Sequence, residues 1–213
     1  MLIRFYAITL ISATLILPNA YSAGFVAVYL DGASEGYNDP TVVTSDITGE
    51  STTLGADRRA CLEAAMAVLE THLDITVDIQ VQAEFNDLGG SSCCATLGGA
   101  GPLTAEQDFT NAPVSSTWFV QAQVNQLVGS DGQPGIDDIS SQFNSEVDGT
   151  EVLGTTTWYY GIDGIVPANH IDFFSTAIHE LIHGVGFLSL MDSSSGVLFP
   201  FSPPVFMDIF TSF

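Results

Sequence analysis

A strongly apolar segment that begins at Asp172 constrains this chain more than any other feature. Asp172 is a suitable helix N-cap, and Gly184 and Gly186 mark where the helix should end. A helix that is apolar on nearly every side belongs in the interior of a domain. The sequence therefore predicts a buried central helix near residues 172–186. Its apolar residues are Phe173, Phe174, Ala177, Ile178, Leu181, Ile182, Val185 and Phe187.

The same segment contains the sequence His179-Glu180-Leu181-Ile182-His183. Residues four apart on a helix differ by about 40° in direction and about 6 Å in height, so both imidazoles lean over one face. Neutral histidine nitrogens are good zinc ligands, and a catalytic zinc lowers the pKa of a water molecule toward about 7. We expect His179 and His183 to bind Zn2+ and Glu180 to act as general base. The alternative is a metal-free network, which would bury Glu180 without a counter-charge.

With Gly186 the motif reads H-E-x-x-H-x-x-G, and on these residues the chain resembles metzincin-like zincins, a group of zinc metallopeptidases. The resemblance implies a secreted, zinc-dependent endopeptidase that hydrolyses protein or peptide substrates. In that family the third ligand usually follows the glycine by three residues, where this chain has Ser189. Residues 189–192 instead resemble a variant of secreted bacterial peptidases, H-E-x-x-H-x-x-G-F-x-S-x-x-D, which implies Asp192 as the third ligand.

Three alternatives for this ligand stay open. Asp192 is equally compatible with a role as a turn residue before Ser193. Asp208 is the second candidate, and its neighbour Met207 resembles the methionine beneath metzincin sites. A ligand beyond Phe213 is the third, because the chain ends soon after the motif. The unusual residue at the ligand position also leaves a second class of protein open: an exported binding or adhesion module with an inactive zincin-like core.

The pattern of the remaining chain predicts an α+β fold, and the resemblance implies that residues 23–213 form a zincin-like catalytic domain. An incomplete C-terminus of this domain stays open as an alternative. We expect a first packing helix at 57–73, with Asp57 as its cap, beside a twisted mixed sheet. The resemblance implies a cleft between the edge strand of that sheet and the motif helix, with the peptide extended along the strand. Expected strands are 25–30, 75–83, 139–143 and 155–160, with a further helix at 118–128 and a long loop at 86–111.

The N-terminus and the charge balance indicate where such a protein works. Residues 1–22 have the apolar run and small-residue cleavage site of a signal peptide, so we expect a secreted protein without stable membrane insertion after cleavage. The chain has 3 basic and 25 acidic residues, for a net charge of -22. Such a protein repels phosphate backbones and anionic lipids, which argues against nucleic acid as a partner. We expect a monomer.

Cysteines and acidic turns supply two further predictions. An exported protein meets an oxidising compartment, and neighbouring cysteines pair poorly, so Cys61 is expected to form a disulfide with Cys93 or Cys94. The acidic turn at residues 131–138 has carboxylates that suit Ca2+, but its spacing differs from the EF-hand loop. A solvated acidic turn is therefore preferred to a calcium site.

Overall fold

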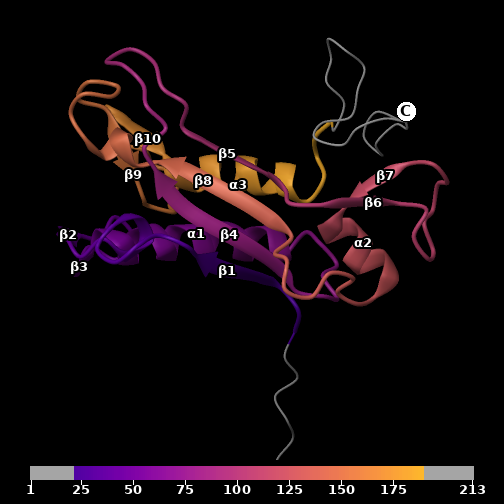
Figure 1. Ribbon diagram of the computed structural model, residues 1–213. Helices are drawn as coiled ribbons and strands as arrows, with labels where there is room; N and C mark the ends of the chain where they lie inside the picture. The colour runs from indigo at the N-terminus through magenta and orange to yellow at the C-terminus, as the bar shows by residue number, and fades with distance from the viewer. Residues whose placement is uncertain (1–21, 190–213) are drawn as a thin grey trace, which may run out of the picture.

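The computed structural model describes residues 22–189, which form a mixed α+β structure around a four-stranded sheet (Figure 1). The strand order is β1-β4-β8-β5. The first three strands are parallel, whereas β5 runs antiparallel to β8 and forms one edge. The strands span Phe25–Tyr29 (β1), Ile79–Asn86 (β4), Ile139–Asn144 (β8) and Gly98–Pro102 (β5).

Two helices, α1 (Leu54–Glu70) and α3 (Phe173–Gly184), pack against each other on the same face of this sheet (Figure 1). Every second residue of β4, from Ile79 to Phe85, is buried, as expected for a strand with one face against helices. The hydrophobic core lies between these layers. Its fully buried members include Leu62 of α1, Val81, Phe143, and Phe173 and Leu181 of α3.

Smaller elements lie at the two ends of the sheet. At one end, β2 (Val42–Thr44) pairs with β3 (Ser51–Thr53), and β9 (Thr157–Tyr159) pairs in parallel with β10 (His170–Asp172). At the other end, α2 (Gln121–Val128) lies beside the antiparallel pair β6 and β7 (Figure 1). The last elements are β6 (Ala105–Gln107), β7 (Trp118–Val120) and the 3-10 helices η1 (Gly36–Asn38) and η2 (Ser145–Asp148).

The first helix was expected near residues 57–73 but begins earlier, at Leu54. Thr53 is its N-cap, and the Thr53 hydroxyl accepts a hydrogen bond from the amide of Ala56. The prediction that Asp57 caps this helix is wrong. The Asp57 side chain is buried and accepts hydrogen bonds from the Ser45 hydroxyl and the Asp46 amide, which ties the β2–β3 turn to the helix.

The predicted loop at 86–111 is also wrong, because it contains β5 and β6. A glycine-rich strand such as β5 has little intrinsic β propensity, so the sequence gives no strand signal there. The extended conformation of β5 is stabilised by its antiparallel pairing with β8. A Cβ on Gly98 would lie 2.7 Å from the Phe143 ring, so the close approach of β5 to the core requires a glycine at this position.

The predicted disulfide is not formed, since Cys61, Cys93 and Cys94 are all free. Cys61 is 0% exposed and packs in the core between α1 and the sheet. Cys93 and Cys94 are exposed on the loop between β4 and β5. Burial raises the pKa of the Cys61 thiol, and the nearby Asp172 and Asp57 carboxylates raise it further. The physical reason for the failed pairing is therefore that Cys61 belongs to the core.

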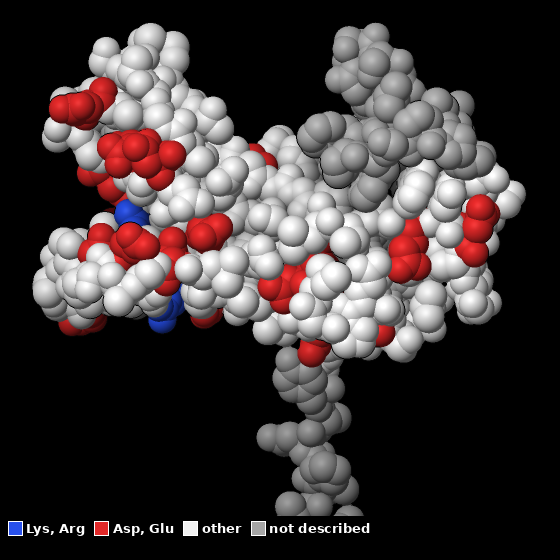
Figure 2. Space-filling view, viewed as in Figure 1, with Lys and Arg blue, Asp and Glu red and all other residues white. Residues whose placement is uncertain are grey.

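The surface carries the acidic excess expected from the sequence (Figure 2). Carboxylates are spread over the visible face, and basic groups occupy only small areas of it. No helix in the described part of the chain combines the length and apolarity needed to cross a membrane. The predicted signal peptide falls almost wholly on residues 1–21, outside the described residues.

Candidate metal centre

Helix α3 has one buried side and one side that faces an open groove. Phe173, Ala177 and Leu181 are 0% exposed and fill the core beneath the sheet. His179 is exposed on the opposite side, and Glu180 is partly exposed. The expectation of a helix buried all round is therefore wrong for one side. That side lines a groove of about 510 Å³ together with residues of β5 and the segment before it.

The structure brings His179 and His183 together on this open side. Their Nε2 atoms lie 3.1 Å apart, and the two rings are nearly perpendicular, with an interplanar angle of 88°. Tetrahedral coordination at zinc, with Zn–N distances of about 2.0–2.1 Å, places two ligand nitrogens about 3.3 Å apart. The observed separation fits two ligands of one zinc ion with little movement of either ring.

The second nitrogen of His183 is held by the backbone. His183 Nδ1 lies 2.8 Å from the carbonyl oxygen of Phe187. A carbonyl only accepts, so Nδ1 is the donor, and in the neutral ring Nε2 then carries the free lone pair. Zinc-binding histidines commonly use a carbonyl or carboxylate in this way to fix the tautomer and the ring orientation. The hydrogen bond therefore leaves His183 Nε2 as the ring nitrogen that could bind a metal.

The turn after α3 positions this carbonyl. The amide of Gly186 donates to the carbonyl of His183 at 3.0 Å, and the amide of Phe187 donates to the carbonyl of Ile182 at 3.0 Å. This pair of hydrogen bonds is a Schellman motif, in which the residue after the C-cap has a positive φ. Gly186 has φ +111°, a conformation that side-chain-bearing residues rarely adopt. The glycine of the H-E-x-x-H-x-x-G motif thus places the partner of His183.

We expect Gly186→Ala to weaken zinc binding by about 10–100-fold, the usual effect of disturbing the hydrogen-bond partner of a metal-binding histidine. It should also lower the free energy of unfolding by about 1–3 kcal/mol through backbone strain. Gly164→Ala is the matched control, because Gly164 has φ +72° with no atom within 4 Å of an added Cβ. Isothermal titration with zinc should show weaker binding for the Gly186 variant alone. Equal zinc affinities in the two variants would contradict the role of the turn.

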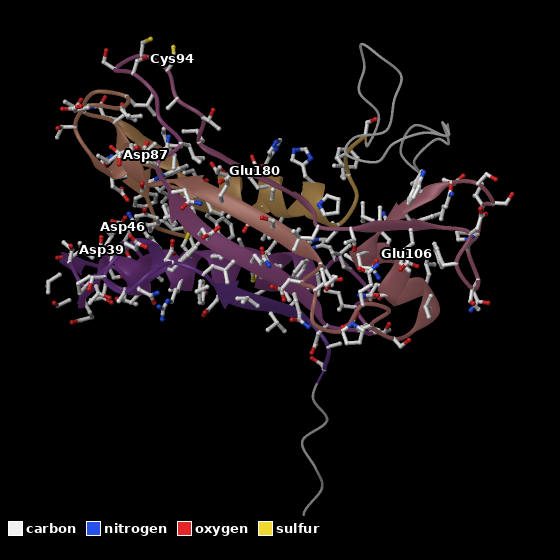
Figure 3. All side chains as sticks on the ribbon, viewed as in Figure 1. Asp39, Asp46, Asp87, Cys94, Glu106 and Glu180 are labelled. Atoms are coloured by element: carbon white, nitrogen blue, oxygen red, sulfur yellow. The ribbon has the colours of Figure 1, made fainter. Side chains whose placement is uncertain are left out.

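Glu180 lies between α3 and the edge strand β5 (Figure 3). Its Oε2 accepts a hydrogen bond of 3.0 Å from the amide of Ala100. The carboxylate is therefore anchored through one oxygen, beside the histidine that precedes it in the chain. Both side chains line the same groove, with Leu97, Gly98, Ser175 and Thr176. A base held at this place can take a proton from a water molecule bound near the two imidazoles.

The third predicted ligand cannot be placed, since Asp192 and its alternative Asp208 both lie outside the described residues. Within residues 22–189, no group of three His, Cys, Asp or Glu side chains is arranged to hold a metal ion. The donors that are present, two imidazole nitrogens, suit zinc rather than calcium, which takes oxygen ligands.

The carboxylates of the acidic turn at 131–138 are engaged in hydrogen bonds within the protein. Asp131 accepts from the amide of Gln133, and Asp137 accepts from the side-chain amide of Gln82. Asp138 accepts from the amide of Gln80 and the Asn125 side chain, while burial raises the pKa of this carboxyl group. These bonds connect α2 and the acidic turn to the sheet, a structural use of the carboxylates.

Two groups at the site are backbone atoms that sequence reasoning did not identify: the amide of Ala100 and the carbonyl of Phe187. Only the glycine at position 186 gave a signal for the second of them. His170, the remaining histidine near α3 in sequence, lies in β10, where its Nδ1 contacts the carbonyl of Ala168. Comparison with known protein families, curated proteins and solved structures found no match to this chain.

Proposed function

We propose that this protein is a zinc-dependent peptidase in which His179 and His183 bind the metal and Glu180 is the general base. The observation that carries the proposal is the 3.1 Å separation of the two Nε2 atoms, with His183 Nδ1 already bonded to a carbonyl. Two imidazoles whose Nε2 atoms converge, with a carboxylate that lines the same groove as His179, suit metal-assisted hydrolysis. Export into the extracellular medium belongs to the same proposal.

In this reaction each residue has a separate task. Zinc, when bound, polarises the substrate carbonyl and lowers the pKa of the attacking water. Glu180 accepts the proton of that water during the attack and returns it to the leaving amine. The hydrogen bond from Ala100 holds one carboxylate oxygen, so the other is free for proton transfer. The Phe187 carbonyl keeps His183 in the tautomer that binds the metal.

The edge strand β5 supports a peptide as the substrate. One side of β5 pairs with β8, from Gly98 opposite Phe143 to Pro102 opposite Ile139. The other side borders the groove that contains His179 and Glu180. An extended peptide can add to a strand edge through backbone hydrogen bonds. The Ala100 amide on this edge already donates to Glu180 Oε2, so a peptide would pair with the other backbone groups of β5. A Cβ added to Gly99 or Gly101 would meet no atom within 4 Å, so the sheet face on that side of β5 is open.

The zincin-like identity of the domain is part of this proposal. An antiparallel edge strand beside the motif helix agrees with the cleft that the resemblance implies. Asp192 remains the proposed third ligand, as the resemblance of residues 189–192 implies.

Removal of the hydrogen-bond partner of a metal ligand usually weakens metal binding by about 10–100-fold. His179→Ala removes the proposed ligand itself, so we expect it to weaken zinc binding by more than this. His72→Ala is the matched control, because His72 lies just after α1 and contacts the carbonyl of Val68. The test is zinc content after dialysis, measured together with cleavage of a peptide library before and after chelation. Wild-type protein that takes up no zinc would refute the proposal. Zinc uptake without any cleavage would favour the inactive binding module.

A further inference from the structure

Two adjacent cysteines lie at the end of an exposed loop, away from the metal centre. The loop connects β4 and β5, and Figure 3 shows Cys94 at its outer end. The Sγ atoms of Cys93 and Cys94 lie 2.9 Å apart, and both residues are exposed. The Ser91 hydroxyl lies 3.3 Å from Cys93 Sγ. The proposed peptidase chemistry uses neither of these two thiols.

The backbone holds the two thiols in a fixed turn. The amide of Ser91 donates to the carbonyl of Cys94 at 2.8 Å, and the amide of Cys94 donates back to the carbonyl of Ser91 at 3.4 Å. The amide of Leu153 also donates to the carbonyl of Ser91, at 2.8 Å. This outer contact attaches the turn to the segment before β9. The separation of the thiols is therefore set by a supported turn and needs no rearrangement of the fold.

The base of the loop is closed by one buried side chain. Asn144, 0% exposed at the end of β8, donates through Nδ2 to the carbonyls of Gly89 and Thr96. Its Oδ1 accepts from the amide of Leu88. Both ends of the loop are thereby joined to the central sheet, and three residues after Cys94 the chain reaches Leu97, which lines the groove.

The surroundings of the two thiols also shift their pKa values in opposite directions. The Cys94 thiol and the Ser91 hydroxyl both lie within hydrogen-bond distance of Cys93 Sγ and can donate to its thiolate, which lowers the pKa of Cys93, whereas the contact with Cys93 raises the pKa of Cys94. The thiolate is the reactive form of cysteine in thiol–disulfide exchange. Cys93 is therefore the attacking thiol, and Cys94 lies in the position of the resolving thiol.

We propose that Cys93 and Cys94 form a reversible dithiol–disulfide pair that exchanges with small-molecule disulfides. The Cys93 thiolate attacks one sulfur of a disulfide RSSR, forms a mixed disulfide and releases RS⁻. Cys94 loses its proton and attacks Cys93 Sγ, which breaks the mixed disulfide and releases the second RS⁻. Overall, the two protein thiols lose two electrons and two protons, and RSSR becomes two RSH.

The geometry of neighbouring residues makes this pair suited to reversible exchange rather than to permanent cross-linking. Adjacent Cα atoms are about 3.8 Å apart across a trans peptide, whereas most disulfides join Cα atoms separated by about 4.4–6.8 Å. Strained and exposed disulfides are the ones that are reduced most readily. Cys61 cannot compete as a partner, because its side chain is 0% exposed in the core.

The test is oxidation of the full chain with glutathione disulfide in a buffer that contains a chelator, followed by intact-mass measurement and alkylation of free thiols. We expect the monomer to lose about 2 Da and two alkylatable thiols, with recovery after treatment with a dithiol reductant. Cys94→Ser should instead accumulate the glutathione adduct at Cys93, at least about tenfold above wild type. Cys61→Ala should behave as wild type.

Three outcomes would overturn the proposal: a lasting adduct on wild-type protein, a disulfide-linked dimer, or a cross-link that maps to Cys61. Because the measurement needs neither zinc nor a peptide substrate, its result does not depend on the proposed peptidase activity. A wild-type chain that keeps both exposed thiols free under these conditions would be equally decisive against it.

Discussion

Glu180→Gln is expected to lower kcat for peptide hydrolysis by about 10²–10⁴-fold, the usual contribution of a general base. Glutamine retains the size of the side chain and an oxygen that accepts the hydrogen bond from the Ala100 amide. It lacks the carboxylate that we propose takes the proton from water. Because the two imidazoles proposed to bind zinc are unchanged, we expect the zinc content and the thermal unfolding temperature to remain close to those of the wild type.

The matched control is Glu63→Gln, which makes the same chemical change on α1. Glu63 is exposed and accepts a hydrogen bond of 2.9 Å from the Tyr29 hydroxyl. We expect this variant to cleave peptides at the wild-type rate. Full activity in the Glu180 variant would show that another group is the base. Loss of zinc from the same variant would assign Glu180 to metal binding instead of proton transfer.

The sequence predicted the parts of the fold in which side-chain periodicity reports burial. Strands β1 and β8 lie where alternation and apolar runs placed them, and α3 begins at Phe173, one residue from the expected start. Periodicity failed for β5, because glycines carry no hydrophobic pattern. Its conformation is specified by pairing with β8 and by the contact with Glu180, both of which are distant in sequence.

In the candidate site, too, the sequence predicted some features and missed others. The facing of His179 and His183 follows from a spacing of four residues on a helix, so the motif alone predicted it. The amide of Ala100 and the carbonyl of Phe187 are backbone groups, which every residue has, and only the tertiary structure selects them. The cysteine prediction failed for a similar reason, since the spacing of cysteines does not reveal that Cys61 is buried.

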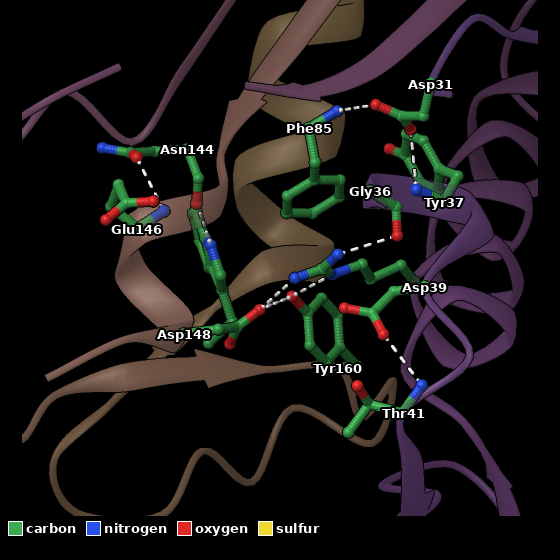
Figure 4. A network of polar contacts seen from close by, with 12 residues as sticks. Asp31, Gly36, Tyr37, Asp39, Thr41, Phe85, Asn144, Glu146, Asp148 and Tyr160 are labelled. Atoms are coloured by element: carbon green, nitrogen blue, oxygen red, sulfur yellow. Dashed lines mark hydrogen bonds and ion pairs between the residues drawn. The ribbon is translucent and has the colours of Figure 1, made fainter. Parts of the chain in front are cut away.

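The end of the molecule that carries β2–β3 and β9–β10 is held by one buried arginine on α1. Arg58 is 3% exposed, and its guanidinium donates to the Gly36 carbonyl at 2.7 Å, to Asp148 at 2.7 Å and to the Tyr160 hydroxyl at 3.0 Å (Figure 4). The Tyr160 hydroxyl in turn donates to Asp148 at 2.6 Å. The guanidinium carbon lies 4.2 Å from the centre of the Phe85 ring.

This network joins four segments that are far apart in sequence: η1, α1, the end of β4 and the chain from η2 to Tyr160. Burial raises the pKa of the Tyr160 hydroxyl well above its usual value, and the Asp148 carboxylate adds to this effect. Burial alone would lower the pKa of the Arg58 guanidinium, but Tyr160 and Asp148 outweigh it and raise the pKa. Tyr160 therefore stays neutral and Arg58 stays positively charged at neutral pH, and Arg58 is the ion-pair partner of Asp148.

Arg58→Met is expected to lower the free energy of unfolding by about 3–5 kcal/mol, the usual cost of removing one partner from a buried ion pair. Methionine can fill much of the volume beside Phe85, but it leaves the Asp148 carboxylate, whose side chain is 19% exposed, without its counter-charge. The Gly36 carbonyl also loses one of its two donors and keeps only the amide of Asp39, at 3.3 Å. Urea denaturation followed by tryptophan fluorescence measures the change, because Trp158 is buried near the network, in β9.

Arg59→Met separates this local effect from a general effect of charge. Both substitutions remove one positive charge from a chain of net charge -22, so any change in overall repulsion is the same in the two variants. Arg59 is partly exposed, its guanidinium carbon lies 4.9 Å from the Tyr29 ring centre, and the guanidinium donates to the Asn38 side chain, two contacts that contribute about 1 kcal/mol each. If the two variants are destabilised equally, overall charge is the cause and the network is not. If the network is the cause, adding Asp148→Asn to Arg58→Met should recover about 1–3 kcal/mol, because it removes the carboxylate that the first substitution leaves unpaired.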